Sequence, residues 1–323
     1  MGQIVSAVGM SHAPPLTADK DSPPQDQLDR MHASMDQLHD LIDRSKPDLI
    51  VAVIDDHFEN FFGDFMPTFA ISIADSNYGP PDHYLEWLKL PQEEVRNNPD
   101  FAKALLAHTR HSGFDVVQTG RVAFGHALMV PMHFLRPQFD IPVVPIFTNV
   151  FTPPLATAER TYDLGACVRD FISERPERVT VIATGALSHW PPYWKQGDPE
   201  DDEFLERMRV FQTEGLSVID RDPNLFVDLG IREIEMAASG TPLVNPEWDQ
   251  RMMKAFSEGD VEQIRGLTYE DVEREGGNGG HEILNWAMML GMLGGAPMTA
   301  YSYDNCVEWM CGIGFVGWEA PGA

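Results

Sequence analysis

The chain has 323 residues, of which 43% are hydrophobic and 10% aromatic, a balance typical of a folded globular protein. Its 23 Lys and Arg residues are outnumbered by 50 Asp and Glu residues, which leaves a formal net charge of −27 at pH 7. A surface this acidic repels phosphate backbones and anionic lipid, so we expect no nucleic acid and no membrane among the partners. A small anionic substrate is not excluded, because a single pocket can be locally basic.

The cysteines and the longest apolar stretch indicate a cytoplasmic protein. Cys167, Cys306 and Cys311 form no CxxC pair and no ligand-like cluster, so a disulfide framework is not expected. The stretch from Trp286 to Met298 is shorter than the roughly 20 apolar residues that a membrane helix requires. The N-terminus has no basic segment followed by a long apolar one, so no signal peptide is predicted.

Five continuous apolar runs of strand length occur along the chain. They are rich in β-branched residues and do not alternate with polar ones, which is typical of central strands covered on both faces. The runs are Ile4–Met10, Leu49–Ile54, Phe69–Ala74, Ile141–Phe147 and Val179–Ala183.

Helical patterns separate these strands. Apolar residues from Met31 to Ile42 recur at helical spacing between the first two strands. Further helices are predicted at Pro99–Ser112, Ala158–Ser173, Glu203–Asp220 and Val261–Leu267. Strands that alternate with helices predict an α/β fold with a largely parallel central sheet flanked by helices. Because no linker or internal repeat interrupts the pattern, we expect a single domain over residues 1–323.

Three of the predicted strands end close to a histidine: His12 after SAVGMS, His57 after LIVAVIDD and His189 after VTVIATGALS. In open α/β sheets, ligands bind outside the carboxyl ends of the strands. The three histidines therefore have a common edge of the sheet available to them. The alternative for each histidine alone is a loop residue that bonds a backbone carbonyl.

Two histidines and one carboxylate form the facial triad of non-haem Fe(II) oxygenases, so a carboxylate partner is needed. Glu282 follows the glycine-rich GGNGG and lies in the first turn of a predicted apolar helix, where the helix dipole favours an ionised carboxylate. The alternative for Glu282 is a capping residue that serves only the helix. Glu247 in NPEWDQ is a second candidate, and periodicity does not choose between the two.

Five segments together resemble one family. SHAPPL, DDHFENFFGDFMPTFAI, GALSHWPP, NPEWDQRMM and GGHEILNW occur in the order and spacing of the class III extradiol ring-cleavage dioxygenases. The resemblance is to the group that contains the protocatechuate 4,5-dioxygenase catalytic subunit and the 2,3-dihydroxyphenylpropionate dioxygenases. It extends over nearly the whole chain, to the C-terminal VEWMCGIGF.

The resemblance implies a role for each matching residue. His12, His57 and Glu282 match the Fe(II) ligands, which decides in favour of Glu282 over Glu247. His189 matches the acid/base histidine. His126 in FGHALMVP matches a second histidine that takes part in proton transfer. Many relatives have Asp immediately before that histidine, whereas this chain has Gly125, so any partner that the Asp supplies is absent or replaced.

Other residues near these positions have two interpretations. Asp56 either orients His57 or is a solvated turn residue. Aromatic residues beside the proposed ligands either sandwich a planar ring or belong to the core; they are Phe58, Phe61, Phe62, Trp190 and Trp194. The remaining histidines match no catalytic position and are predicted to lie on the surface or on helix faces; they are His32, His39, His83, His108, His111, His133 and His281.

The resemblance implies an oxidoreductase that inserts both atoms of O2 into a catechol and cleaves the ring beside the diol, giving a semialdehyde in aromatic catabolism. Fe(II) is the expected cofactor. We expect a homo-oligomer, and some relatives also require a small partner subunit. Three alternatives remain open on the same fold: cleavage of a 2-aminophenol, a zinc hydrolase, and a non-catalytic binding subunit.

Overall fold

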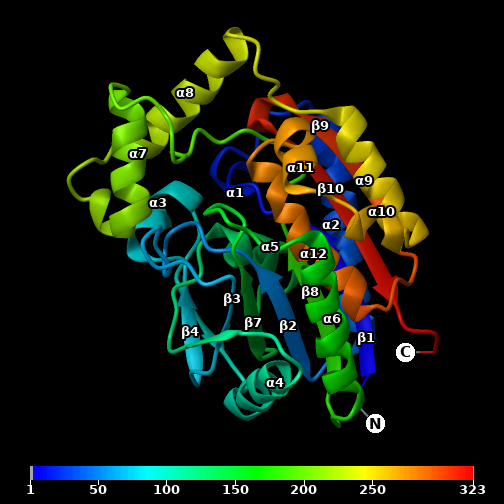
Figure 1. Cartoon of the computed structure of the whole chain (residues 1–323). Coiled ribbons are helices and arrows are strands. Elements are labelled where there is room, and N and C mark those ends of the chain that lie inside the picture. The colour runs from blue at the N-terminus through cyan, green and yellow to red at the C-terminus, as the bar shows by residue number, and fades with distance from the viewer. Residues whose placement is uncertain (1–2, 323) are drawn as a thin grey trace.

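The computed structural model describes residues 3–322 and contains one large sheet with helices on both faces (Figure 1). The eight strands of this sheet run in the order β6-β3-β7-β2-β8-β1-β10-β9, and β4 and β5 form a separate pair. The strands are β1 (Gln3–Met10), β2 (Leu49–Ile54), β3 (Phe69–Ser72), β4 (Ser76–Gly79), β5 (Glu93–Arg96), β6 (Val117–Thr119), β7 (Val143–Thr148), β8 (Arg178–Thr184), β9 (Thr299–Cys306) and β10 (Cys311–Glu319).

The centre of the sheet is parallel and its edges are mixed. Neighbouring pairs among β7, β2, β8 and β1 are all parallel, and nearly every residue in these strands is buried. The predicted α/β class and largely parallel sheet are therefore confirmed. β3 is antiparallel to β7, and β10 is antiparallel to β1. β9 and β10 also pair antiparallel, because only the short turn Val307–Trp309 and one residue join them, whereas a parallel pair needs a long crossover.

The helices form two layers. α2 and α5 pack against one face of the sheet, and α4, α6, α9 and α12 pack against the other. The helices are α1 (Pro15–Ala18), α2 (Gln25–Ser45), α3 (Leu85–Leu88), α4 (Pro99–His111), α5 (His126–Leu135), α6 (Ala158–Ser173), α7 (Glu203–Glu214), α8 (Leu225–Ala238), α9 (Pro246–Glu258), α10 (Val261–Arg265), α11 (Tyr269–Glu275) and α12 (Ile283–Met292). No helix among residues 3–322 is long and apolar enough to cross a membrane.

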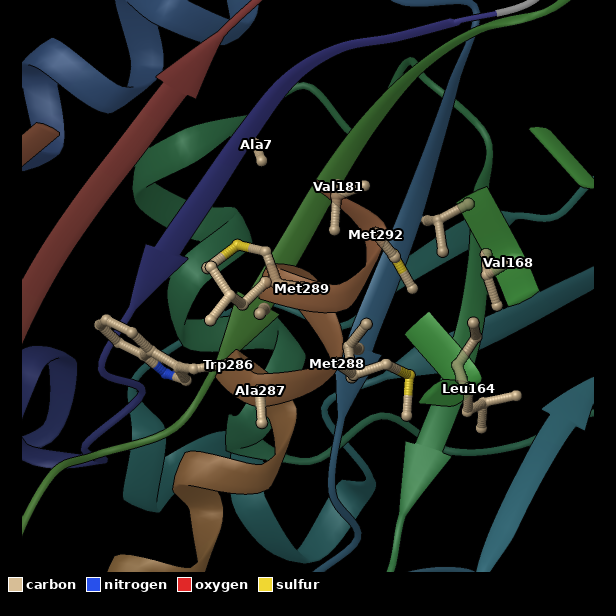
Figure 2. Close-up of a cluster of buried hydrophobic side chains, with 14 of the residues drawn as sticks. Ala7, Leu164, Val168, Val181, Trp286, Ala287, Met288, Met289 and Met292 are labelled. Atoms are coloured by element: carbon tan, nitrogen blue, oxygen red, sulfur yellow. The ribbon is translucent and has the colours of Figure 1, made fainter. Parts of the chain in front are cut away.

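α12 is buried along its whole length, with all of its residues in the interior of the protein. Trp286, Met288 and Met289 lie among apolar side chains of α6 and of the sheet (Figure 2). Burying a large apolar side chain stabilises the fold by roughly 1.5–3 kcal/mol. The N-terminus of α12, which carries Glu282, is therefore held firmly against the sheet.

Two differences from the sequence prediction have clear causes. The helix predicted over Glu203–Asp220 ends at Glu214, because Gly215 has φ 68°, outside the helical region, and a 3-10 turn follows. α5 was not predicted, since all of its residues but two are buried and Pro131 lies inside it, so it shows no polar face to mark a helix.

Candidate active site

The three strand-end histidines meet at one edge of the sheet. β2, β8 and β1 are neighbours, so His57, His189 and His12 emerge from adjacent strands. Glu282, the last residue of the 3-10 turn Gly279–Glu282 before α12, faces them. Its Oε2 lies 3.1 Å from Nε2 of His12, and its Oε1 lies 3.6 Å from Nε2 of His57 and 3.5 Å from Nε2 of His189. One buried carboxylate thus contacts all three imidazoles.

The hydrogen bonds around His12 fix its tautomer. The hydroxyl of Thr184, at the end of β8, donates to the carbonyl of Ala127 at 2.7 Å. It must then accept from Nδ1–H of His12, which lies 3.0 Å away. Nε2 of a neutral His12 therefore carries a free lone pair, and this buried atom has no hydrogen-bond partner in residues 3–322. A lone pair in this position is suited to binding a metal ion.

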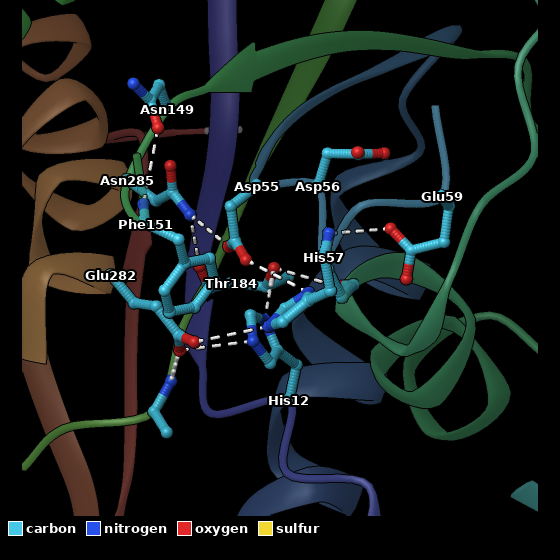
Figure 3. Close-up of polar contacts among 12 residues, drawn as sticks. His12, Asp55, Asp56, His57, Glu59, Asn149, Phe151, Thr184, Glu282 and Asn285 are labelled. Atoms are coloured by element: carbon cyan, nitrogen blue, oxygen red, sulfur yellow. Dashed lines mark hydrogen bonds and ion pairs between the residues drawn. The ribbon is translucent and has the colours of Figure 1, made fainter. Parts of the chain in front are cut away.

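His57 is oriented by Asp55. Nδ1 of His57 lies 3.3 Å from Oδ2 of Asp55, while Nε2 points toward Glu282 (Figure 3). The amide of Asn285, on α12, donates to Oδ1 of Asp55 at 2.8 Å. A carboxylate behind a histidine is the usual partner of a metal-ligating imidazole.

Asp56 has neither of the roles considered from the sequence. It is buried, and its carboxylate accepts the backbone N–H groups of Asn60 and Phe61, so it closes the loop after β2. Asp55 was missed, although the sequence contains a signal for it. In an extended chain, residues two apart point to the same side, which places Asp55, and not Asp56, on the side of His57.

The site has the donors that a divalent metal ion requires. One ligand atom each from His12, Asp55, His57 and Glu282 lies within 4.8 Å of the others, and all four residues are buried. A second group at the same place joins His12 and His57 to His126. Burial by itself would raise the pKa of Glu282, but the imidazoles of His12 and His189 that face it hold the pKa well below its usual range, so this carboxylate is ionised. Glu247 is exposed on α9 and is not brought to this site.

His189 is placed differently from the ligand candidates. Its Nδ1–H donates to the carbonyl of Leu187 at 2.9 Å, so in the neutral ring the lone pair is on Nε2, which faces Glu282. Burial by itself would lower the pKa of His189, but the nearby Glu282 raises it to about 9. A side chain at Gly279 would place its Cβ 2.2 Å from Nε2 of His189, so the glycine-rich segment lets the chain pass directly behind this imidazole.

His126 begins α5 and stands beside the ligand candidates, with its ring centroid 3.9 Å from that of His57. Burial and the neighbouring imidazoles lower the pKa of His126 well below its usual value, so it is a neutral ring. Gly125 is explained by Glu59, since a Cβ at position 125 would lie 2.0 Å from Oε1 of Glu59. A carboxylate from the loop after β2 thus occupies the space beside His126, and burial raises the pKa of Glu59 well above its usual range.

A cavity of about 240 Å³ opens next to these residues. Its walls are mainly aromatic and come from Tyr84, Trp87, Phe151, Tyr193, Phe211, Phe226 and Trp309. None of the five aromatic residues singled out from the sequence lines it; Phe58, for example, is fully buried and packs against Phe211. Proximity in sequence to the histidines was therefore a poor guide, because the cavity wall is assembled from α3, α7, α8 and the C-terminal hairpin.

Asp249, on α9, positions the loop that carries His189. Its carboxylate accepts the backbone N–H and the hydroxyl of Ser188, at 2.8 and 2.9 Å, and the hydroxyl of Tyr303 at 2.9 Å. Asp249 belongs to the NPEWDQ segment, in which only Glu247 was considered as a site residue from the sequence. Because Ser188 directly precedes His189, the NPEWDQ segment acts on the site through the backbone.

The prediction that the unmatched histidines lie on the surface or on helix faces is wrong for His281. It is buried and stacks on Tyr269, with ring centroids 4.5 Å apart. Its Nε2 lies 3.2 Å from a carboxylate oxygen of Glu273, away from Glu282. We assign His281 to the packing of the turn and to no catalytic role.

Comparison with known proteins agrees with this geometry. Residues 6–314 match the family described as the catalytic LigB subunit of aromatic ring-opening dioxygenase. A 2,3-dihydroxyphenylpropionate/2,3-dihydroxicinnamic acid 1,2-dioxygenase of Photorhabdus laumondii is 29% identical over 97% of this chain and 96% of its own length. A protein of the same name from Burkholderia vietnamiensis is 30% identical over 84% of each chain. An uncharacterized protein of Escherichia coli K12 has the same fold, with a TM-score of 0.56, 16% identity, and coverage of 97% of this chain and 99% of that one.

The chain therefore belongs to the family of catalytic LigB subunits of aromatic ring-opening dioxygenases. The resemblance found in the sequence is confirmed, and so is the enzyme class that it implied, an extradiol ring-cleaving dioxygenase of aromatic catabolism. The alternative of a non-catalytic subunit loses its basis, because the chain carries the catalytic-subunit pattern together with a buried candidate metal site.

Proposed function

We propose that this ring-cleaving dioxygenase holds one Fe(II) ion on His12, His57 and Glu282, and that it cleaves a catechol with His189 as the base. The ion would bind the catechol oxygens and O2 at the coordination positions that the three protein ligands leave open.

The observation that carries the proposal is the set of polar contacts behind the imidazoles. The hydroxyl of Thr184 accepts a hydrogen bond from Nδ1 of His12, and a carboxylate oxygen of Asp55 lies 3.3 Å from Nδ1 of His57, so both Nε2 atoms are directed at Glu282. Two neutral imidazoles and one carboxylate on one side of a cavity match the facial triad of non-haem iron oxygenases. His189 is held by a backbone carbonyl instead and belongs to neither group of candidate ligands.

His189 is suited to remove a proton from a catechol hydroxyl. Its Nε2 faces the cavity, and an imidazole titrates in the range where a base for neutral pH is needed. Without a cation, Glu282 attracts a proton to His189. A cation held by Glu282 would offset this attraction and leave His189 neutral, as a base must be.

His126 and two tyrosines complete the surroundings of the ring. His126 is neutral and its Nδ1 has no partner in residues 3–322, so it can accept a hydrogen bond from the substrate. Burial raises the pKa of Tyr84 and Tyr193 well above the usual value, so both phenols keep their protons and can donate hydrogen bonds. The aromatic walls exclude water from the diol end.

A catechol fits this arrangement because its two adjacent oxygens can bind one ion together. The relatives named above are dioxygenases of 2,3-dihydroxyphenylpropionate and 2,3-dihydroxycinnamic acid. For this chain we propose the same diol unit, with a ring substituent that the outer part of the cavity selects.

Metal analysis of protein purified without oxygen tests the proposal. We expect about one iron per chain and one O2 consumed per catechol cleaved, with the yellow semialdehyde as product. His12→Ala and Glu282→Ala should lose both the stoichiometric iron and the turnover.

Glu247→Ala is the matched control, since it removes an exposed carboxylate from the other motif that the sequence offered. It should bind iron and turn over as the unmodified protein does. Full activity in Glu282→Ala, or turnover that persists with zinc alone and without O2, would contradict the proposal.

A further inference from the structure

The cavity is short of positive charge. Its lining includes two carboxylates, Glu233 and Glu282, and no Lys or Arg from residues 3–322. The only lining residues able to carry a positive charge are the histidines, which gather around Glu282. Apart from the histidines and Glu282, Glu233 is the only lining residue among residues 3–322 whose side chain titrates near neutral pH.

Glu233 comes from the inner face of α8. With Phe226, Leu229 and Gly230 it forms the part of the cavity wall that this helix supplies, at spacings of three and four residues that share one face. It also lines a smaller neighbouring cavity with Trp190 and Met310. Glu233 therefore borders both the main cavity and the smaller one.

The carboxylate of Glu233 has no ion-pair or hydrogen-bond partner among residues 3–322. Its neighbour in sequence, Arg232, is paired with Asp202 instead. Lys195, on the loop after β8, is paired with Glu273. Because surrounding protein removes water from Glu233 and no cation replaces it, the pKa of this carboxyl is raised to about 7, while His189 opposes the rise.

We propose that the ring substituent of the substrate is uncharged, and that Glu233 excludes catechols with a carboxylate at this place. This inference rests on the proposed cleavage of a catechol. A carboxylate in the outer cavity would meet a second carboxylate and apolar walls, with no cation to pair with it, and both effects oppose binding. An uncharged substituent meets neither cost, since its apolar part packs on Phe226 and Leu229.

Two probes that differ only in charge test the inference: 3-(2,3-dihydroxyphenyl)propionate and its primary amide, which has the same shape. For the Fe(II)-loaded protein at pH 8, we expect kcat/KM for the amide to exceed that for the acid by at least ~10-fold, since like charges brought together in a cavity are strongly unfavourable. In Glu233→Gln the preference should fall to within about threefold, because the isosteric amide side chain keeps the shape and removes the charge. Glu235→Gln is the matched control, since it removes an exposed charge from the same helix, and its preference should equal that of the unmodified protein.

A binding measurement separates this inference from the proposed function. Trp87 and Trp309 line the cavity, so quenching of tryptophan fluorescence in oxygen-free protein loaded with Zn²⁺, which keeps His189 neutral without allowing turnover, reports binding of either probe. If neither probe is cleaved, the proposed function fails, and the ratio of the two dissociation constants still decides the inference. Equal values for acid and amide, tighter binding of the acid, or an unchanged ratio in Glu233→Gln would overturn it. Thermal unfolding of each variant establishes that it is folded, and Glu233→Ala provides a second test of the same ratio.

Discussion

The two sides of the cavity are built in different ways. The side with His12, His57 and Glu282 is formed by the ends of adjacent buried strands and by the first turn of a buried helix. The opposite side is supplied largely by α7 and α8, which project from the body of the molecule (Figure 1). On α8 the inner face lines the cavity, while Val227, Ile231 and Ile234 on the outer face are 63%, 50% and 62% exposed.

We infer that the sheet edge carries the residues of the reaction, whereas α8 carries residues that select the substrate. Side chains at the sheet edge are held by buried hydrogen bonds and ion pairs and lie within a few ångströms of one another, as a reacting centre requires. α8 makes few contacts outside α7, so its inner residues can change without disturbing that centre. We therefore expect substitutions at the sheet edge to abolish turnover, and substitutions on α8 to change which catechol is used.

The largest effect should follow His189→Ala. Loss of a positioned base typically costs 10²–10⁴-fold in rate, so kcat should fall within this range while iron content stays the same. A nitrocatechol, already deprotonated in solution, should still bind, which spectrophotometric titration can check. His32→Ala, which removes an exposed histidine on α2, is the control. Loss of iron from His189→Ala would show that His189 is a metal ligand and would contradict its assignment as the base.

Gly279→Ala should misplace the same imidazole without removing it. The added methyl group would lie 2.2 Å from Nε2 of His189, and a displacement of about 1 Å can cost up to ~10²-fold in rate. We expect kcat to fall ~10–100-fold at unchanged iron content. Gly280→Ala is the matched control, because its new methyl group would meet no atom closer than 3.5 Å. Equal rates for the two variants would show that His189 need not be held in place.

The two adjacent aspartates should differ in their effect on metal binding. In Asp55→Asn an amide replaces the oxygen that faces Nδ1 of His57, and losing such a partner typically weakens metal affinity 10–100-fold. In Asp56→Asn the loop keeps an acceptor for the backbone N–H groups, so metal affinity should be little changed. Competition with a chelator measures both affinities. The same loss in both variants would contradict the orientation role of Asp55.

The smallest effect should be a pH dependence of the preference for the amide probe over the acid probe, caused by Glu233 on α8. The pKa of Glu233 is raised to about 7, so this carboxyl is mostly protonated at pH 6 and mostly ionised at pH 8. Repulsion of an acidic substituent therefore grows with pH, and the preference for the amide probe over the acid should rise several-fold between about pH 6 and 8. The titrations of His189 and of the diol affect both probes alike and cancel in the ratio of kcat/KM values. A ratio that falls with rising pH, or does not change, would show that Glu233 does not select between substrates.

Much of the fold followed from local pattern. The strand Leu49–Ile54 and the helix Ala158–Ser173 have the predicted bounds. A buried run of β-branched residues, and a helix with one apolar and one polar face, can each be recognised from the local sequence alone. α8 and α9 were not predicted, although their apolar residues recur at helical spacing as regularly as those of the predicted helix α6. The antiparallel β9–β10 hairpin was also missed, because its edge strand is only partly buried.

The sequence by itself determined that His12, His57 and His189 gather at one sheet edge, because parallel strands place their carboxyl ends together. The sequence also contains two candidate carboxylate ligands, Glu282 and Glu247, and the family resemblance favoured Glu282. Only the tertiary structure decided that Glu59 fills the space beside Gly125, and that α8 brings Glu233 to the cavity. These contacts join segments whose relative positions depend on packing between elements, and no local pattern of residues encodes that packing.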